Sequence, residues 1–430
     1  MVADDTIFAV ASGAGRAAIA VMRLSGSLCH RTIAALCSGQ VPEPRRASLR
    51  RLHDDDGAVL DRAMVLWMPG PGTYTGEDTA ELFLHGGRAV TEGVAMALVG
   101  LGLRPAEPGE FTRRAFLNGR MDLVEAEAVH DLIFAETEAQ RRQALRQLDG
   151  ELGRVYRDWS DRLRFMLAQQ EALIDFPDED LPPEVEAELV ATLMSLRSDV
   201  AAHLNDARRG EKLREGLVFA IVGPPNVGKS SLINALAERD VAIVSSIPGT
   251  TRDALEARVV LGGVPVTLVD TAGLRETADA IEAEGVRRAL VRAEDADLIV
   301  EVSDSGHFAD EPASLRIMVA NKSDLGQPAQ AGAVAVSALT GDGLDVLRDR
   351  LAVAARTMTE TAGPPPLTRA RHRAALLEAL DRLDTAIETD LPELRGEDLR
   401  LALRAIGRIV GHVGVEDILD TLFGQFCIGK

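Results

Sequence analysis

The stretch Gly223-Pro-Pro-Asn-Val-Gly-Lys-Ser230 follows an apolar segment at 217–222 and precedes a helical pattern at 231–237. A strand, a glycine-containing turn and a helix in this order predict a phosphate-binding loop, whose backbone N–H groups surround phosphate oxygens at a helix N-terminus. Lys229 would reach the β- and γ-phosphates, and the Ser230 hydroxyl would be a ligand of Mg²⁺. The other loop residues assigned to the nucleotide site are Asn226, Val227, Gly228 and Ser231.

Two more motifs follow this loop along the chain. The apolar segment 265–269 leads into Asp270-Thr-Ala-Gly273, where Asp270 would hold the magnesium shell and the Gly273 N–H would meet the γ-phosphate. The segment 317–320 leads into Asn321-Lys-Ser-Asp324, whose last carboxylate would accept both N–H groups on the Watson–Crick edge of guanine. Adenine lacks the exocyclic amine, so this motif selects GTP over ATP. Further residues assigned to the GTP site are Ser245, Thr250, Thr251, Thr271, Ala272, Asn321, Lys322, Asp324, Ser337 and Ala338.

The segment between the first two motifs, Ser245-Ser-Ile-Pro-Gly-Thr-Thr-Arg-Asp253, is typical of a switch whose threonine hydroxyl closes on Mg²⁺ when the γ-phosphate is present. A plain structural turn is the alternative. Gly273 is followed by Leu274, which cannot orient the attacking water as a glutamine does in Ras-like enzymes. Glu282 is a candidate for that role, and either Arg275 or a bound cation for stabilising the transition-state charge. Neighbouring acidic residues leave the choice of Glu282 open on residue type alone.

Length and composition limit the class of protein. A chain of 430 residues predicts two or three compact units, and no apolar run approaches the roughly 18–20 residues that span a bilayer. The net charge of −20 argues against general polyanion binding, because such affinity comes from Lys and Arg on phosphates. An acidic N-terminus and three cysteines without metal-ligand spacing are expected of a soluble, cytoplasmic protein with reduced thiols.

The pattern of apolar residues predicts α/β segments combined with all-α segments. Residues 1–118 contain short strands at 6–10, 18–24, 63–67 and 79–84 and form a small α/β domain. Residues 119–215 and 357–430 are helical by pattern, and residues 216–356 alternate strands with helices around a mostly parallel sheet. We therefore expect a Ras-like P-loop GTPase domain inserted into a central helical domain.

Motifs outside the nucleotide site give a resemblance that covers nearly the whole chain. Tyr74-Thr-Gly-Glu-Asp78, His85-Gly-Gly87, the stretch 108–120 (PGEFTRRAFLNGR) and the C-terminal Phe426-Cys-Ile-Gly-Lys430 accompany the GTPase motifs. With these, the sequence resembles the bacterial tRNA-modification GTPases of the MnmE (TrmE) family. The resemblance implies that residues 1–118 bind folate and dimerise, and that the GTPase domains of a homodimer close face to face.

The resemblance also implies ligands and roles for particular residues. Thr251 falls on a Mg²⁺ position and Glu282 on a water-orienting glutamate, while K⁺ would act where other GTPases use an arginine finger. The implied K⁺ ligands are Asn226, Ser245, Ile247 and Thr250. Positions that contact a formyl- or methylene-tetrahydrofolate in the family correspond to Arg23, Glu81, Arg120 and Lys430. Position 120 is commonly lysine there, and arginine keeps the charge as a planar fork.

The implied reaction is the addition of a carboxymethylaminomethyl or aminomethyl group at C5 of the wobble uridine of tRNA. The implied assembly is a heterotetramer with an FAD-dependent protein of the MnmG (GidA) type, with GTP hydrolysis switching it between states. Cys427, close to the implied folate site, is a possible nucleophile, and a bystander thiol is the alternative.

Two rival functions remain open on the sequence alone. A ribosome-assembly GTPase is one, because Gly411-His-Val-Gly414 superficially fits the GXXG loop of a KH domain. A folate-dependent methyl-group transferase that acts alone is the other, but the intact Lys229, Asp270 and Asp324 argue against an inactive nucleotide domain.

Overall fold

The computed structural model describes residues 5–13, 15–175, 183–239, 256–270, 296–308, 315–326, 328–360, 365–411 and 416–429. Contacts divide the chain into two compact units, one formed by residues 1–130, 153–160 and 406–430 and the other by residues 131–152 and 161–405. The division follows contacts rather than sequence order, and the domain boundaries at 118, 215 and 356 stay a prediction. Among the described helices, none combines the length and the apolar character needed to cross a membrane.

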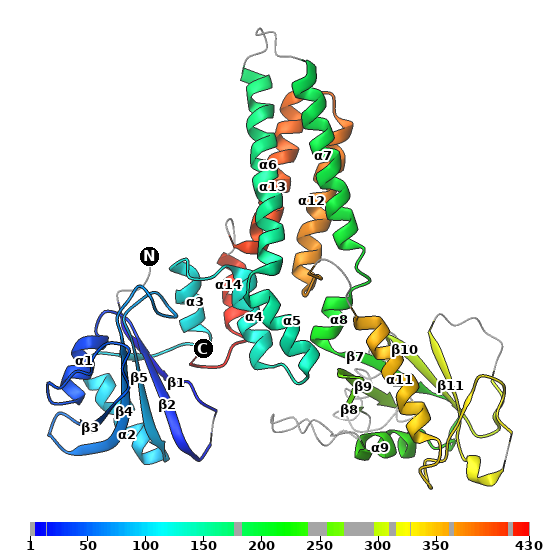
Figure 1. Cartoon of the computed structure of the whole chain (residues 1–430), viewed down its shortest axis with the longest axis horizontal. Coiled ribbons are helices and arrows are strands. Elements are labelled where there is room, and N and C mark those ends of the chain that lie inside the picture. The colour runs from blue at the N-terminus through cyan, green and yellow to red at the C-terminus, as the bar shows by residue number, and fades with distance from the viewer. Residues whose placement is uncertain are drawn as a thin grey trace, which may run out of the picture. The chain divides into compact units, whose positions relative to one another are not determined.

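The first unit contains a six-stranded sheet with the order β3-β4-β5-β2-β1-β6 (Figure 1). Its strands are β1 (Ile7–Val10), β2 (Ala17–Ser25), β3 (Ser48–His53), β4 (Val59–Met68), β5 (Thr79–Gly86) and β6 (Arg104–Pro105). Neighbours are antiparallel except β1 and β6, which are parallel. The four strands predicted in this region are confirmed, whereas β3 and β6 were not predicted.

The two faces of this sheet differ. Helices α1 (Cys29–Leu36) and α2 (Arg88–Gly100) supply Ile33 and Leu98 to one core with Val65 of β4. On the other face, α3 (Glu110–Leu117) brings Phe111 against Ile7 and Ala9 of β1. Successive side chains of a strand point to opposite faces of the sheet. The buried side chains of β4 and β5 point to the first face, so the residues between them point to the second.

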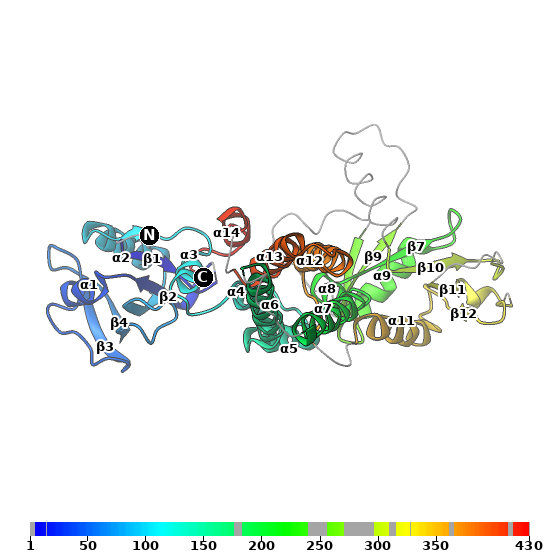
Figure 2. The ribbon, with the colours of Figure 1, turned by 90° about the horizontal axis from the view of Figure 1, so that it is seen from above.

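Helices predominate outside the sheets. They are α4 (Leu123–Ile133), α5 (Glu138–Leu148), α6 (Glu151–Asp175), α7 (Pro183–Leu204), α8 (Arg209–Glu215), α12 (Ala370–Glu388), α13 (Pro392–Val410) and α14 (Glu416–Phe423). In both views α6, α7, α12 and α13 lie side by side (Figures 1 and 2). Ion pairs link neighbours, such as Arg197–Asp384 between α7 and α12 at 2.7 Å. Segments on either side of the GTPase motifs thus pack together.

The second sheet has the order β12-β11-β10-β7-β9-β8. It contains β7 (Leu217–Val222), β8 (Glu256–Leu261), β9 (Val264–Asp270), β10 (Leu298–Ser303), β11 (Arg316–Ala320) and β12 (Val334–Ala335). Every pairing is parallel except that of β8 with β9. The predicted, mostly parallel sheet is confirmed.

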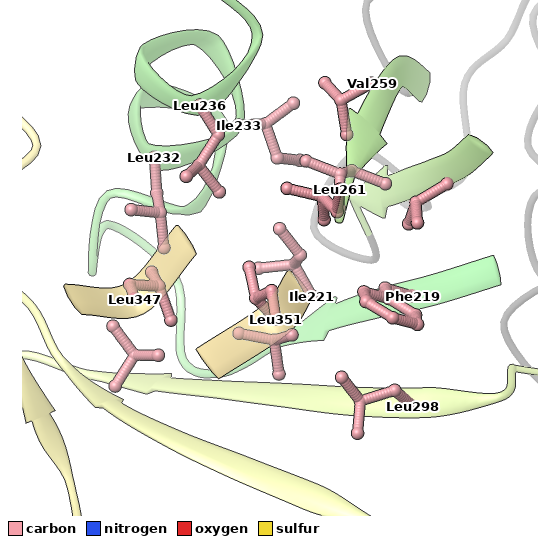
Figure 3. Close-up of a cluster of buried hydrophobic side chains, with 14 of the residues drawn as sticks. Phe219, Ile221, Leu232, Ile233, Leu236, Val259, Leu261, Leu298, Leu347 and Leu351 are labelled. Carbon is pink, nitrogen blue, oxygen red and sulfur yellow. The ribbon is translucent and has the colours of Figure 1, made fainter. Parts of the chain in front are cut away.

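The core of this sheet lies between its strands and helices α9 (Lys229–Arg239) and α11 (Leu344–Thr359). Phe219 and Ile221 of β7 belong to one buried cluster with side chains of both helices (Figure 3). Leu232 comes from α9 and Leu351 from α11, and both are fully buried. The packing fixes β7 and α9, and with them the two ends of the phosphate-binding loop.

Candidate functional site

The loop between β7 and α9 depends on two glycines. A Cβ at Gly223, where φ is +150°, would lie 2.2 Å from the Val302 carbonyl oxygen. At Gly228, where φ is +92°, a Cβ would lie 2.5 Å from the side-chain nitrogen of Asn321. Asn226 also has a left-handed backbone, with φ of +63°. The loop can therefore pass close to β10 and Asn321 only with glycine at both positions.

Lys229 begins α9 and is only 4% exposed. Its ammonium donates hydrogen bonds to the carbonyl oxygens of Gly223 at 2.7 Å and Pro224 at 2.8 Å. The charge is therefore held on the inner side of the loop, beside the N-terminus of a helix, where both the cation and the backbone N–H groups favour an anion. This arrangement suits a phosphate.

Two oxygen ligands meet next to this lysine. Asp270 ends β9, and its buried carboxylate accepts a hydrogen bond of 2.5 Å from the Ser230 hydroxyl. A carboxylate and a hydroxyl are hard oxygen donors of the kind that Mg²⁺ binds beside nucleotide phosphates. The two residues assigned to magnesium from separate motifs thus fit that ion.

The base-binding side of the site is connected to the loop by Asn321. Its amide donates to the Val227 carbonyl oxygen at 2.7 Å, and its side-chain oxygen accepts from the Ala338 backbone N–H at 3.1 Å. Asn321 is 4% exposed, so both bonds are shielded from water. Asn321 therefore joins the first motif, its own motif and the 337–338 segment in one hydrogen-bonded unit.

Lys322 makes a second connection to the loop. Its ammonium donates to the Asn226 carbonyl oxygen and pairs with Asp304, both at 2.9 Å. The hydrogen bond from Lys322 lowers the pKa of Asp304. Asp324 lies in a short 3₁₀ helix, Ser323–Leu325, with its side chain exposed. Lys322 thus spans the loop, while the Asp324 carboxylate stays available to a base.

Other assigned residues fall outside the described part of the chain. They are Ser245, Ile247, Thr250, Thr251, Thr271, Ala272, Gly273, Arg275, Glu282 and Lys430. Their assignments to GTP, Mg²⁺, K⁺, catalysis and folate stay predictions.

The predicted one-carbon residues Arg23 and Glu81 are neighbours. They are directly paired residues of β2 and β5, and the Arg23 guanidinium donates two hydrogen bonds to one Glu81 oxygen, at 2.8 and 3.0 Å. The Arg23 guanidinium also lies 5.7 Å from the ring centre of Tyr74 and 5.9 Å from that of Phe111. A partly exposed ion pair beside aromatic rings offers a cation, an anion and flat apolar surfaces together.

Arg120 and the C-terminal segment lie close to other parts of the same unit. A Cβ at Gly76 would lie 3.3 Å from two methylene carbons of Arg120. Ile428 forms a β-bridge with Pro108, and a Cβ at Gly429 would lie 2.5 Å from the Val10 carbonyl oxygen. The C-terminal motif thus lies against the end of β1, next to the strand that carries Arg23.

All three cysteines lie in the described part of the chain, and each is a free thiol. Cys427 is exposed, while Cys29 and Cys37 are buried at the two ends of α1. Burial, with the nearby carboxylates Asp78 and Glu77, raises the pKa of Cys29 to about 12. Burial likewise raises the pKa of Cys37 to about 11. Of the three thiols, only that of Cys427 is accessible enough to be reactive.

A buried charge network was missed at the sequence level. Arg114 is 3% exposed and pairs with Asp5 at 2.6 Å, Glu110 at 2.9 Å and Glu77 at 3.2 Å. Burial raises the pKa of Glu110, but hydrogen bonds from Arg104, a backbone N–H and Arg114 outweigh it and leave the pKa below its ordinary value. The sequence feature that could have indicated this network is the motif at 108–120, which contains both Glu110 and Arg114.

The phosphate loop, the Ser230–Asp270 pair and the Asn321 connection define a P-loop protein built for a guanine nucleotide. Comparison with known proteins gives the family. A model of the MnmE helical domain matches residues 123–427, and a model of the GTP-binding protein TrmE N-terminus matches residues 6–120. The chain belongs to the MnmE family of tRNA modification GTPases, and it is a GTP hydrolase.

Named relatives agree with this assignment over almost their full length. The tRNA modification GTPase MnmE of Gluconacetobacter diazotrophicus is 63% identical over 429 residues, covering 99% of this chain and 98% of the relative. The protein of the same name from Granulibacter bethesdensis is 58% identical over 439 residues, covering 99% and 100%. Among solved structures, the FeoB G-domain from Methanococcus jannaschii is 24% identical and covers 33% of this chain and 98% of that chain, with a TM-score of 0.23.

Proposed function

We propose that GTP hydrolysis by this chain drives the addition of a carboxymethylaminomethyl or aminomethyl group at C5 of the wobble uridine of tRNA. A flavin-dependent protein of the MnmG (GidA) type would be the partner in a heterotetramer, acting in the cytoplasm. The observation that supports this best is the presence in one chain of two separate sites, the nucleotide loop with Lys229 and the Arg23–Glu81 pair in the N-terminal sheet.

Magnesium and potassium are part of the proposal. Ser230 and Asp270 would hold Mg²⁺, directly or through its water, with Thr251 joining them, and the short contact between the first two supports this. Asn226 would contribute to a K⁺ site with residues 245–250, and the exposure of its side chain supports this. Bound K⁺ supplies positive charge near the transferring phosphate. Glu282 would orient the attacking water.

A tetrahydrofolate derivative fits the chemistry of the N-terminal residues. The Glu81 carboxylate can accept N–H groups of a pterin ring, and the rings of Tyr74 and Phe111 offer flat apolar surface. Arg23, Arg120 and Lys430 would meet the carboxylates of the glutamyl tail. A bound folate supplies the one-carbon unit. The Tyr74 hydroxyl bonds Thr112 at 2.9 Å, which holds the ring in place before any ligand arrives.

The homodimer would form through the second face of the N-terminal sheet. Leu49, Met64, Phe83 and Val21 are paired in register across β3, β4, β5 and β2, and they form one row. Leu49 is 64% exposed and Met64 42% exposed. A row of apolar side chains on a sheet face favours burial against another copy. Arg23 lies two residues after Val21 on β2, and Glu81 lies two residues before Phe83 on β5, so both are on this face. The folate site would therefore border the interface.

The test is the nucleoside content of tRNA from a host that lacks its own copy of this enzyme and expresses the full-length chain. The wild-type chain should restore the C5-modified uridine, measured by mass spectrometry. Lys229→Ala and Glu81→Gln should each fail, because they remove the phosphate ligand and the proposed pterin ligand. Arg88→Gln, at an exposed pair with Glu92 on α2, is the matched control and should behave as wild type. Full modification with Lys229→Ala would instead support a transferase that acts without GTP.

A ribosome-assembly GTPase is the alternative. Such a factor has no use for folate, so binding of 5-formyltetrahydrofolate to the purified chain, lost in Glu81→Gln, separates the two functions. Of the GXXG sequence that suggested a KH domain, residues 412–414 lie outside the described part of the chain, and the described elements before and after it are the helices α13 and α14.

A further inference from the structure

A cavity of about 440 Å³ lies in the second unit, away from the nucleotide loop. Its walls come from α5, the start of α6, α8, the β8–β9 turn, the C-terminal end of α11 and residues 365–368. Figure 1 shows α5, α8 and α11 beside β8 and β9. The volume lies within the roughly 300–1,000 Å³ range of small-molecule sites.

The segments that form the cavity are held to one another by specific contacts. The Gln140 side chain of α5 donates to the carbonyl oxygens of Leu213 at 3.2 Å and Arg214 at 3.0 Å. Arg258 of β8 pairs with Glu136, just before α5, at 2.8 Å. The walls of the cavity are therefore connected elements of the sheet and the helices.

Apolar surface predominates inside the cavity, beside the Gln143 and Gln147 side chains, and three arginines lie at its mouth. Leu152, Leu213 and Val264 are at most 8% exposed and form the inner surface. Arg142, Arg146 and Arg356 are exposed lining residues. Arg142 pairs with Glu138 and Arg146 with Glu151, both at 2.8 Å. In the described part of the chain, Arg356 has no such partner, although Glu360 also lines the cavity.

A buried hydroxyl gives an independent indication of a ligand. Thr368 lines the cavity and is 1% exposed, and its Oγ1 has no hydrogen-bond partner among the described residues. A buried hydroxyl without a partner is costly, so such groups usually meet water or a ligand. Gly262 adds to the site, because a Cβ there would lie 3.1 Å from Cγ of Arg356, and glycine lets the arginine stem lie against the β8–β9 turn.

We propose that this cavity binds a small organic carboxylate with an apolar body. The carboxylate pairs with Arg356 at the mouth and accepts a hydrogen bond from the Thr368 hydroxyl, while the body packs on Leu152, Leu213 and Val264. Because the walls come from both the GTPase sheet and the helices, such a ligand stabilises the observed arrangement of these elements by mass action.

The test uses 1-naphthoate and its neutral counterpart 1-naphthalenemethanol with the full-length chain saturated with GDP. Calorimetry should show naphthoate binding at least about tenfold tighter than the alcohol, since a charge-assisted hydrogen bond is worth that much. Arg356→Gln should remove this preference. Arg348→Gln, on the same helix but outside the cavity, is the control and should keep it.

Thr368→Val provides a second test that does not depend on removing a charge. It should weaken naphthoate binding while leaving the ligand-free chain as stable as wild type or more so, because an isosteric methyl replaces an unpartnered hydroxyl. A less stable ligand-free chain would show that the hydroxyl already has a partner, and would overturn the proposal. Absence of naphthoate binding at millimolar concentration, or equal binding by wild type and Arg356→Gln, would overturn it too.

Discussion

Replacing Asn321 with alanine should weaken GDP binding, because this side chain joins three motifs of the site. The substitution removes the hydrogen bonds to Val227 and Ala338, of 2.7 and 3.1 Å, from a position that is 4% exposed. Each bond contributes about 1 kcal/mol net, so at least ~2 kcal/mol is lost, before adding the cost of stranding their former partners. Part of the free energy of GDP binding must then be used to restore the order of the loop. A cost of ~2 kcal/mol corresponds to a loss of GDP affinity of about 30-fold.

The assay is GDP affinity by fluorescence with a labelled nucleotide, together with amide hydrogen exchange. Exchange at Ala338 should become faster in Asn321→Ala, because its N–H loses its acceptor. Gln330→Ala is the control, since that side chain accepts from the Phe308 N–H at 3.0 Å without contacting the loop. The reasoning is refuted if Asn321→Ala binds GDP within about threefold of wild type, or if Gln330→Ala loses as much affinity.

Three further predictions concern the N-terminal sheet and its surroundings. A disulfide reagent should modify Cys427 in the folded chain and reach Cys29 and Cys37 only after denaturant is added, since burial raises the pKa of the latter two thiols; three fast thiols would contradict this. Gly429→Ala, which forces a Cβ to within 2.5 Å of a backbone oxygen, should reduce 5-formyltetrahydrofolate affinity and leave GTP turnover unchanged, and loss of both would contradict it. The pKa of Glu110 in the folded chain lies below its ordinary value of 4.5. The ionised carboxylate therefore stabilises the fold fully above pH 4.5, and this stabilisation is lost as the pH falls through the folded-state pKa. Acid unfolding of the first unit, followed by near-UV circular dichroism, should depend less steeply on pH in Glu110→Gln than in wild type.

Strands buried on both faces were the easiest part of the fold to predict. The observed bounds of β7, Leu217–Val222, match the apolar run, because a central parallel strand needs apolar residues on both sides. By contrast, β3 has the sequence Ser-Leu-Arg-Arg-Leu-His and lies at a sheet edge. Because it contains two arginines, it was not predicted as a strand. Edge strands require little burial, and sequence periodicity alone does not separate them from loops.

The site was predictable where its residues form short contiguous motifs. Lys229, Asp270, Asn321 and Asp324 each belong to such a motif, and the structure brings the first three to one loop. The contacts between motifs were not predictable, since Asn321 and Val227 are 94 residues apart in the chain. The cavity lined by Thr368 draws on still more segments, none with a motif of its own. Only tertiary packing shows such a site.

The most direct test of the account is GTP turnover by the purified chain in KCl and in NaCl at matched ionic strength, with Asn226→Ala beside wild type. The account predicts that K⁺ strongly accelerates hydrolysis by wild type, that Na⁺ does not, and that Asn226→Ala loses the acceleration. Equal rates in the two salts would contradict the proposed cation site and leave Arg275 or the partner protein as the source of transition-state charge stabilisation.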